Sequence, residues 1–220
     1  MVDLDAAATT PVRREVLEAM WPHLSGRYGN PSSVHGLGQD AAGALVAARR
    51  AVAAVLGVAG RPGDVTFTSG GTESDNAAVK GLALARREAV GATRVLVSAV
   101  EHDAVLESAA WLGRFGFTVQ VLAVDAQGRV DPEEVRRTLE VSGAGGDGSG
   151  ADRVAMVSLQ LANNEVGTLQ PVAEVAALTR AVGVPLHTDA VQAAGWLSLD
   201  VAALGVDALS LSGHKVGAPK

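Results

Sequence analysis

Residues 66–76 read TFTSGGTESDN, a short β-prone run that leads into two glycines and then into polar residues. This order predicts a strand that ends in a tight turn and is followed by a helix. Glycine lets the backbone approach an anion closely, and a helix start offers free N–H groups and a positive dipole end. The stretch therefore predicts a phosphate cradle, with the hydroxyl of Thr72 as an extra donor. An ordinary turn in which Thr72 is the helix N-cap explains the same residues equally well.

Strand-like runs alternate with helical patterns along the rest of the chain. The expected strands are residues 65–68, 94–98, 118–124, 154–159, 184–187 and 208–211. The expected helices are residues 11–20, 38–56, 73–90, 104–115, 132–140 and 172–182. This alternation favours a three-layer α/β/α fold with a mostly parallel central sheet. We expect one domain over residues 1–220, with residues 143–150 as a flexible glycine-rich surface loop.

The composition limits the classes of partner. The formal net charge is −6 and there is no basic tract, so nucleic acid and anionic membranes are poor partner predictions. No apolar run approaches the roughly 18 residues of a spanning helix, and the first residues do not resemble a signal peptide. A cytoplasmic location is the default expectation. The sequence has no cysteine, which excludes a disulfide framework, a thiolate metal site and a cysteine nucleophile within these residues; no metal site is expected.

Two further polar clusters follow the predicted strands at residues 94–98 and 154–159. Residues 98–103 read SAVEHD, where His102 could stack on an aromatic cofactor or shuttle protons, or could be a solvated loop histidine. Residues 161–167 read LANNEVG, where the consecutive amides Asn163 and Asn164 could bind a ring hydroxyl of a ligand or serve a turn. Ligands of open α/β sheets bind at the carboxyl ends of strands, which is where both clusters stand.

Two further clusters, HTDAVQ at residues 187–192 and SLSGHK at residues 210–215, close the predicted rim. Lys215 is set among small residues at a strand end, where a lysine can form a Schiff base with an aldehyde cofactor. Asp189 could hold the ring nitrogen of that cofactor protonated. The alternatives are a helix N-cap for Asp189 and a solvated loop residue for Lys215. Because five polar clusters follow five predicted strands, we expect all of them at one edge of the sheet.

Seven ordered stretches of the sequence are similar to motifs of a known family: LDAAATTP, YGNPSSVHGLG, FTSGGTESDN, EHDAV, NNEVGTLQP, HTDAVQAAG and SLSGHKVGAPK. The chain resembles the class V aminotransferase group of fold-type-I pyridoxal-phosphate enzymes. Within that group it resembles the cysteine desulfurases of the NifS/IscS type. The ending GAPK looks more like the NifS/IscS branch than the SufS branch.

The resemblance implies two sets of cofactor ligands. Lys215 looks like the Schiff-base lysine. The phosphate ligands look like Gly71, Thr72, Ser212 and His214.

Around the ring of the cofactor, His102 looks like the stacked residue and a candidate acid/base. Asp189 looks like the ring-nitrogen partner, and Asn164 and Gln192 look like contacts to the ring oxygen. The implied reaction takes L-cysteine to L-alanine, with Lys215 or His102 moving a proton from the substrate α-carbon.

The resemblance also implies an enzyme cysteine that takes the sulfur as a persulfide, a sulfur-acceptor protein and a homodimer, in the setting of iron–sulfur cluster assembly. In the family that cysteine, an arginine for the substrate carboxylate and a small C-terminal domain all follow the lysine motif. We therefore expect the chain to be the N-terminal, cofactor-binding portion of a longer enzyme. The alternatives are another class V activity, such as a C–S lyase or a selenocysteine lyase, and a non-catalytic scaffold.

Overall fold

The computed structural model describes residue 2, residues 4–143 and residues 153–220, so the predicted loop at 143–150 lies almost wholly outside the described residues. The chain forms two compact units. One consists of Met1–Phe67 together with Gly213–Lys220, and the other of Thr68–Ser212. The expectation of one cofactor-binding domain over residues 1–220 stays a prediction.

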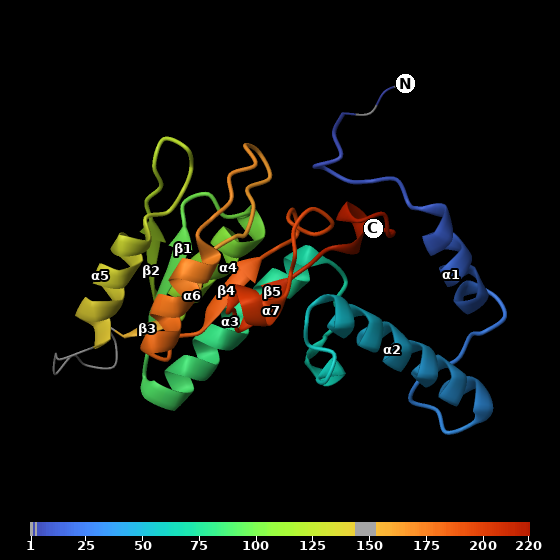
Figure 1. The fold of residues 1–220 in the computed structure, drawn as a ribbon. Coiled ribbons are helices and arrows are strands. Elements are labelled where there is room, and N and C mark those ends of the chain that lie inside the picture. The colour runs from blue at the N-terminus through green and yellow to red at the C-terminus, as the bar shows by residue number, and fades with distance from the viewer. Residues whose placement is uncertain (1, 3, 144–152) are drawn as a thin grey trace. The chain divides into compact units, whose positions relative to one another are not determined.

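The second unit is built on a parallel sheet of five strands in the order β2-β1-β3-β4-β5 (Figure 1). The strands are β1 (Arg94–Ser98), β2 (Thr118–Leu122), β3 (Val154–Ser158), β4 (Leu186–Asp189) and β5 (Ala208–Ser210). Every neighbouring pair is parallel, so all five carboxyl ends meet at one edge. The predicted α/β class with a parallel sheet is confirmed.

The sixth predicted strand, residues 65–68, is wrong. These residues belong to no strand and form no ladder with any strand of the described chain. The guanidinium of Arg49 instead takes the backbone carbonyl of Val65 as its acceptor. The run is β-prone in composition, but a strand also needs a neighbour to pair with. The other predicted strands agree with the structure to within two residues at each end.

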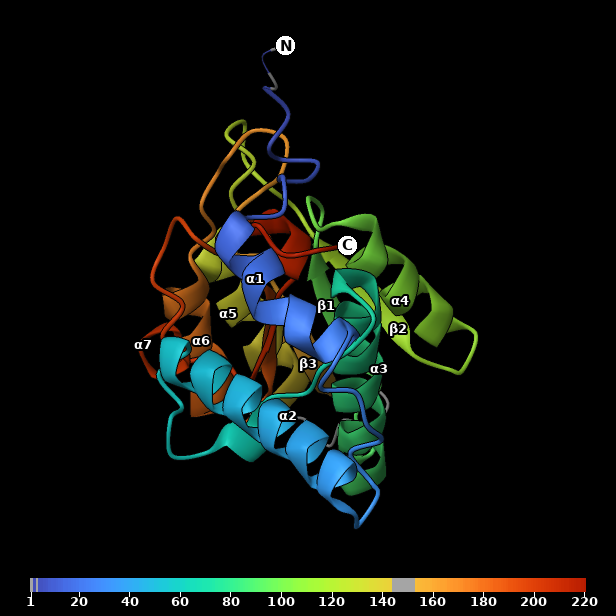
Figure 2. The ribbon, with the colours of Figure 1, turned by 90° about the vertical axis from the view of Figure 1, so that its right-hand side faces the viewer.

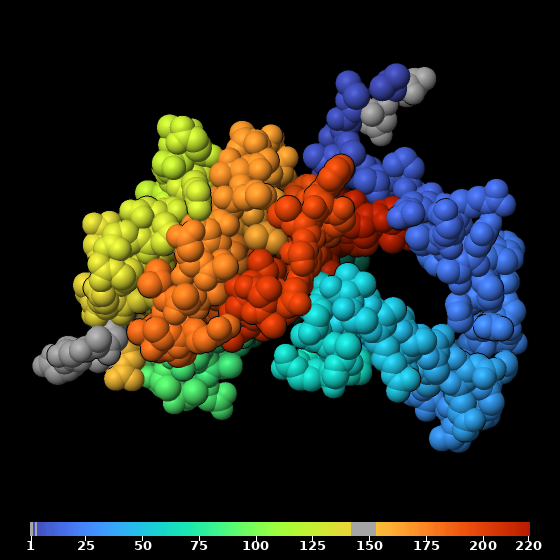
Figure 3. All heavy atoms as spheres, in the orientation of Figure 1, coloured from blue at the N-terminus to red at the C-terminus, as the bar shows by residue number. Residues whose placement is uncertain are grey.

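Helices cover both faces of this sheet. The long helix α3 (Gly71–Val90) and α4 (Asp103–Gly113) pack on one face. The opposite face carries α5 (Pro132–Gly143), α6 (Val172–Ala181) and the short α7 (Val201–Leu204), and Figure 3 shows atoms of α5 and α6, yellow to orange, over much of it. The core between the α3/α4 layer and the sheet is aliphatic; its fully buried members include Val79, Val95, Val97, Val105, Leu112 and Met156. This three-layer arrangement leaves the carboxyl edge of the sheet as the place for polar residues.

The first unit contains α1 (Arg14–Leu24) and α2 (Gly36–Val55), seen in blue and cyan in Figure 2. No residue of α1 is buried. The N-terminal segment pairs with the last residues of the chain. The backbone N–H of Thr10 donates to the carbonyl of His214 (2.9 Å), and that of Arg13 donates to the carbonyl of Gly217 (2.9 Å). Gly217 has φ +86°, and a Cβ there would meet the side chain of Arg13 at 2.4 Å, so only glycine fits this crossing.

Within the described residues, every helix is too short or too polar to cross a bilayer.

Candidate functional site

The start of α3 has no side-chain cap and lies next to two other segments. The N-cap residue Gly70 has no side chain to cap the helix, and Thr72 is the second helical residue, so its alternative role as the N-cap is wrong. A Cβ built on Gly71 would lie 3.3 Å from Cγ2 of Val191 and 3.4 Å from Cβ of Ser212. The helix start, the turn after β4 and the segment after β5 therefore meet at Gly71.

Asp189 is the last residue of β4 and is 8 % exposed. Its Oδ1 accepts a hydrogen bond from the backbone N–H of Val191 (2.9 Å), so the carboxylate supports the turn that follows the strand. No helix begins there, so the alternative role of Asp189 as a helix N-cap is not what the structure shows. Gln192 lies in the same turn and is half-buried. The end of β4 and the turn after it thus present a carboxylate and an amide close to Gly71, where the start of α3 meets this turn.

His102 and Asn164 follow β1 and β3 at the same edge. His102 is exposed and is the N-cap of α4, because its Nδ1 accepts from the backbone N–H of Ala104 (3.1 Å). Asn164 is half-buried, and its Nδ2 donates to Oε1 of Glu165 (2.8 Å). The neighbouring Asn163 joins the two turns, since its Nδ2 donates to the carbonyl of Val100 (3.1 Å).

Lys215 and His214 belong to the first unit, where the N-terminal segment holds both. Nζ of Lys215 donates to the carbonyl oxygens of Ala7 and Ala8, and its distance to the oxygen of Ala8 is 3.0 Å. Nδ1 of His214 lies 3.0 Å from Oγ1 of Thr9. Desolvation, and then the charges of two lysines, lower the pKa of His214. The stretch LDAAATTP, residues 4–11, therefore positions the predicted Schiff-base lysine.

The sequence reasoning missed a buried polar network under the carboxyl edge. His187 of β4 is completely buried between two hydroxyls: its Nδ1 lies 2.9 Å from Oγ of Ser158, and its Nε2 lies 2.9 Å from Oγ of Ser210. The carboxyl of Asp75, 2 % exposed, lies 3.7 Å from the same Nε2. Burial lowers the pKa of His187 to about 4, so the ring is neutral.

A second buried carboxyl, Glu101, belongs to the turn after β1. Its Oε1 accepts hydrogen bonds from the backbone N–H of Gln160 and from the hydroxyl of Ser98, each with a donor–acceptor distance of 2.8 Å. Burial raises the pKa of Glu101 to about 8, against those two hydrogen bonds. Asp75, Glu101 and His187 all belong to the motifs quoted above. The signal in the sequence that could have indicated their burial is a titratable residue close to an apolar run.

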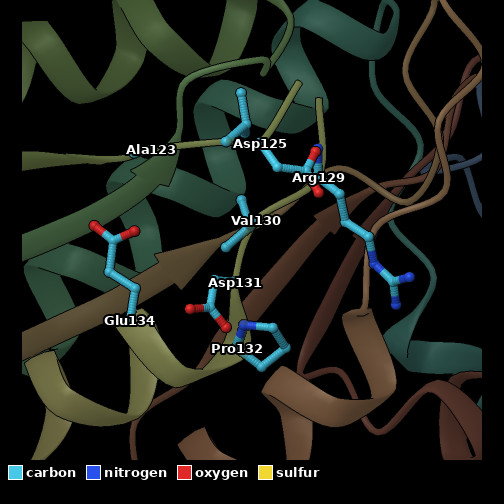
Figure 4. A pocket seen from close by; sticks show the side chains of 8 residues that line it. Ala123, Asp125, Arg129, Val130, Asp131, Pro132 and Glu134 are labelled. Atoms are coloured by element: carbon cyan, nitrogen blue, oxygen red, sulfur yellow. The ribbon is translucent and has the colours of Figure 1, made fainter. Parts of the chain in front are cut away.

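A pocket of about 450 Å³ lies elsewhere in the second unit (Figure 4). It is lined by residues of the β2–α5 connection and the start of α5, among them Asp125, Arg129 and Glu134. None of its lining residues belongs to the predicted cofactor set. The helix-start donors and the buried titratable groups converge instead at the start of α3 and the ends of β1, β4 and β5.

Fold and site define a parallel α/β protein in which a helix start meets the turn after a strand that ends in a carboxylate. The model of the family described as aminotransferase class-V matches residues 2–220, and the chain belongs to this family.

Among its relatives are cysteine desulfurases. The chain is 42 % identical over 219 residues to the cysteine desulfurase IscS of Methanosarcina thermophila, covering all of this chain and 50 % of that protein. It is 44 % identical over 221 residues to an IscS-like cysteine desulfurase of Mycobacterium tuberculosis, of which it covers 53 %. A solved structure of SspA in complex with cysteine superposes with a TM-score of 0.88 at 35 % identity, covering all of this chain and 59 % of that one. The chain spans about half the length of the curated relatives it matches.

Proposed function

We propose that this chain is the cofactor-binding portion of a pyridoxal-phosphate-dependent cysteine desulfurase. The observation that carries the proposal is the close approach of the α3 start to the segment after β5, beside a buried carboxylate at the end of β4. Uncapped N–H groups and neutral hydroxyls suit a phosphate, and a carboxylate suits a protonated ring nitrogen. The residues present therefore fit pyridoxal phosphate.

In this proposal the anion end is held by the backbone of Gly71 and by the hydroxyls of Thr72 and Ser212. When bound, pyridoxal phosphate supplies an electron sink for the carbanion that forms at the substrate α-carbon. Lys215 and His214 complete the set, and their assignment rests on the family resemblance and not on geometry.

The other end of the cofactor would meet the turns after β1, β3 and β4. Asp189 would hold the ring nitrogen protonated, and Asn164 and Gln192 would contact the ring oxygen. The ring of His102 would stack on the cofactor and could move a proton at the substrate α-carbon. Lys215 is the other candidate for that proton transfer.

L-cysteine as substrate, a protein as sulfur acceptor and a homodimer are further parts of the proposal, supported by relatives that are named cysteine desulfurases. The cytoplasmic location stays a prediction from the composition. The 220 residues contain no cysteine, so this part of the protein does not supply a persulfide-carrying thiol. A class V C–S lyase or selenocysteine lyase, which needs no such thiol, is the alternative activity.

The proposal is tested by reconstitution of the purified chain with pyridoxal phosphate. We expect a yellow protein that loses its colour on borohydride treatment, with the reduced cofactor found on Lys215 by peptide mass spectrometry. The Lys215→Ala variant should carry no such label, while Lys80→Ala, which removes a lysine of α3, should be labelled like the wild type. A wild-type chain that stays colourless would favour a non-catalytic scaffold.

A further inference from the structure

A buried carboxyl that the proposed function does not use stands one helical turn after the anion cradle. Asp75 is four residues after Gly71 in α3 and is 2 % exposed. Its Oδ1 has no hydrogen-bond partner among the described residues. The nearest titratable group is the imidazole of His187, whose Nε2 lies 3.7 Å from that oxygen, too far for a hydrogen bond. An ionised carboxylate in this position would be poorly compensated.

Among the described residues, the titratable groups that interact with Asp75 carry no positive charge. From β4 come His187, which is neutral because of its burial, and the carboxyl of Asp189. Glu101, from the turn after β1, is influenced by both aspartates. The strands β3 and β5 contribute the hydroxyls of Ser158 and Ser210 to the ring of His187. Three buried carboxyls therefore share a region in which the neighbouring imidazole carries no charge.

Like charges in a low-dielectric interior cannot all be ionised, and the group with the poorest compensation keeps its proton. Burial, followed by the charge of Asp189, raises the pKa of Asp75 to about 7, while a hydrogen bond from Ser210 opposes the shift. Oδ1 of Asp189 accepts the backbone N–H of Val191, whereas Oδ1 of Asp75 has no hydrogen-bond partner among the described residues. A hydrogen-bond donor to a carboxyl group favours its ionised form.

We propose that Asp75 is a positioning residue for Asp189, holding a proton in the folded chain so that the negative charge of the buried cluster resides on Asp189. The inference rests on the proposed function, in which Asp189 meets the ring nitrogen of the cofactor. Asp75 itself touches neither cofactor nor substrate. It acts by leaving Asp189 as the one anion among the buried aspartates, and above its own pKa it becomes a second anion beside the first.

The location of the proton can be measured without any cofactor. Infrared spectra of the chain, made with aspartate that is isotope-labelled at the side-chain carboxyl, separate protonated aspartic acid from protonated glutamic acid. We expect one protonated aspartic acid band at about pH 6, where exposed aspartates are ionised. This band should titrate with a midpoint near 7. It should be absent from Asp75→Asn at every pH of the titration.

Asp189→Asn is the matched comparison. If the proton resides on Asp75, the band survives in Asp189→Asn, and its midpoint moves down because the neighbouring anion is gone. A band that disappears in Asp189→Asn and persists in Asp75→Asn would place the proton on Asp189 and overturn the proposal. So would a wild-type spectrum without a protonated aspartic acid band at about pH 6.

A second variant keeps the test decisive if Asp75→Asn does not fold. Ser210→Ala removes the hydrogen bond that favours the ionised form of Asp75, so the midpoint of the band should rise. An unchanged midpoint in a folded Ser210→Ala protein would contradict the assignment to Asp75.

Cofactor affinity separates this inference from the proposed function. By equilibrium titration with pyridoxal phosphate at about pH 6, Asp75→Asn should bind within about threefold of the wild type, whereas Asp189→Asn should lose about tenfold or more. If the wild type binds no pyridoxal phosphate but shows the titrating Asp75 band, the proposed function fails and the protonation of Asp75 stands. If Asp75→Asn loses as much affinity as Asp189→Asn, the neutral role of Asp75 is refuted.

Discussion

Nε2 of His187 lies 2.9 Å from the hydroxyl oxygen of Ser210, and this contact joins β4 to β5 through side chains that are almost completely buried. With Ser158 on the other ring nitrogen, one imidazole bridges three adjacent strands. Backbone hydrogen bonds pair these short strands, but they do not determine which polar side chains are buried beneath the carboxyl edge. The bridge does so with a neutral ring, because burial disfavours the imidazolium form.

Acid should weaken this bridge. The folded pKa of His187 is about 4 and the usual value is 6.5, so the unfolded chain binds the extra proton first as the pH falls. The contribution of the neutral His187 to the free energy of unfolding is complete above pH 6.5. It decreases progressively as the pH falls towards 4, by about 3 kcal/mol at most. Asp75 and Glu101 act with the opposite sign over the same range.

Urea unfolding of the wild type and of His187→Asn across this range checks the prediction, because their difference isolates the histidine. The difference in unfolding free energy should shrink as the pH falls. A difference that stays constant with pH would mean that the ring does not titrate with a lowered pKa.

Glu101 predicts a loss of stability as the pH rises from about 4.5 to about 8. Its folded pKa is raised to about 8, so its stabilising contribution is complete below the unfolded value and is lost as the pH rises through 8. Glu101→Gln removes this loss, and its unfolding free energy relative to the wild type should rise with pH by up to about 1.4 kcal/mol per unit. Glu107→Gln, at an exposed position of α4, should track the wild type. Parallel pH profiles for all three proteins would contradict the raised pKa.

The close approach at Gly71 predicts that this residue cannot be enlarged. A Cβ would already lie 3.3 Å from Val191 and 3.4 Å from Ser212, and the γ-methyls of valine would exceed the available space. Gly71→Val should destabilise the fold by about 1–3 kcal/mol and should weaken binding of pyridoxal phosphate. In the same helix, Gly81→Ala meets nothing within 4 Å and should stabilise by about 0.5–1 kcal/mol. Unfolding curves and cofactor titrations that fail to distinguish the two variants would refute the close approach.

The two adjacent asparagines should separate into a structural and a ligand-binding role. Oδ1 of Asn163 accepts the backbone N–H groups of Glu165 and Val166 (2.9 and 3.0 Å), and its Nδ2 donates to Val100. Asn163→Ala should therefore cost about 1–3 kcal/mol of unfolding free energy. Asn164→Ala should leave stability within about 0.5 kcal/mol and reduce cofactor affinity. Unfolding curves and cofactor titrations check both variants. A loss of stability in Asn164→Ala and a loss of affinity alone in Asn163→Ala would contradict these assignments.

The alternation of strand and helix was readable from the sequence because apolar runs of strand length and helix length differ, and five of the six expected strands are present. Residues 65–68 were overpredicted, since β-propensity says nothing about whether a partner strand lies alongside. The polar ends of β1, β3, β4 and β5 were also readable, because a carboxylate or amide at the end of an apolar run is conspicuous.

The buried network was not readable. His187 stands in the quoted stretch HTDAVQ, but its partners Ser158 and Ser210 are 29 and 23 residues away in sequence. Only the order of strands in the sheet brings the three together, and a single sequence does not state that order. The hold of Ala7 and Ala8 on Lys215 was hidden for the same reason, as the residues are more than 200 positions apart.

Gly71 leaves the ribosome early and Ser212 late, because synthesis proceeds from the N-terminus. The start of α3 therefore cannot meet the segment after β5 until the ribosome has translated the chain as far as Ser212. The parallel pairing of β1 with β3 must wait as well, and such long-range pairing is slow. A nascent chain that stalls before Ser212 would lack one side of the close approach at Gly71. The proposed capture of pyridoxal phosphate would therefore be a late event in biosynthesis, and the unfinished chain would have to avoid aggregation without that ligand.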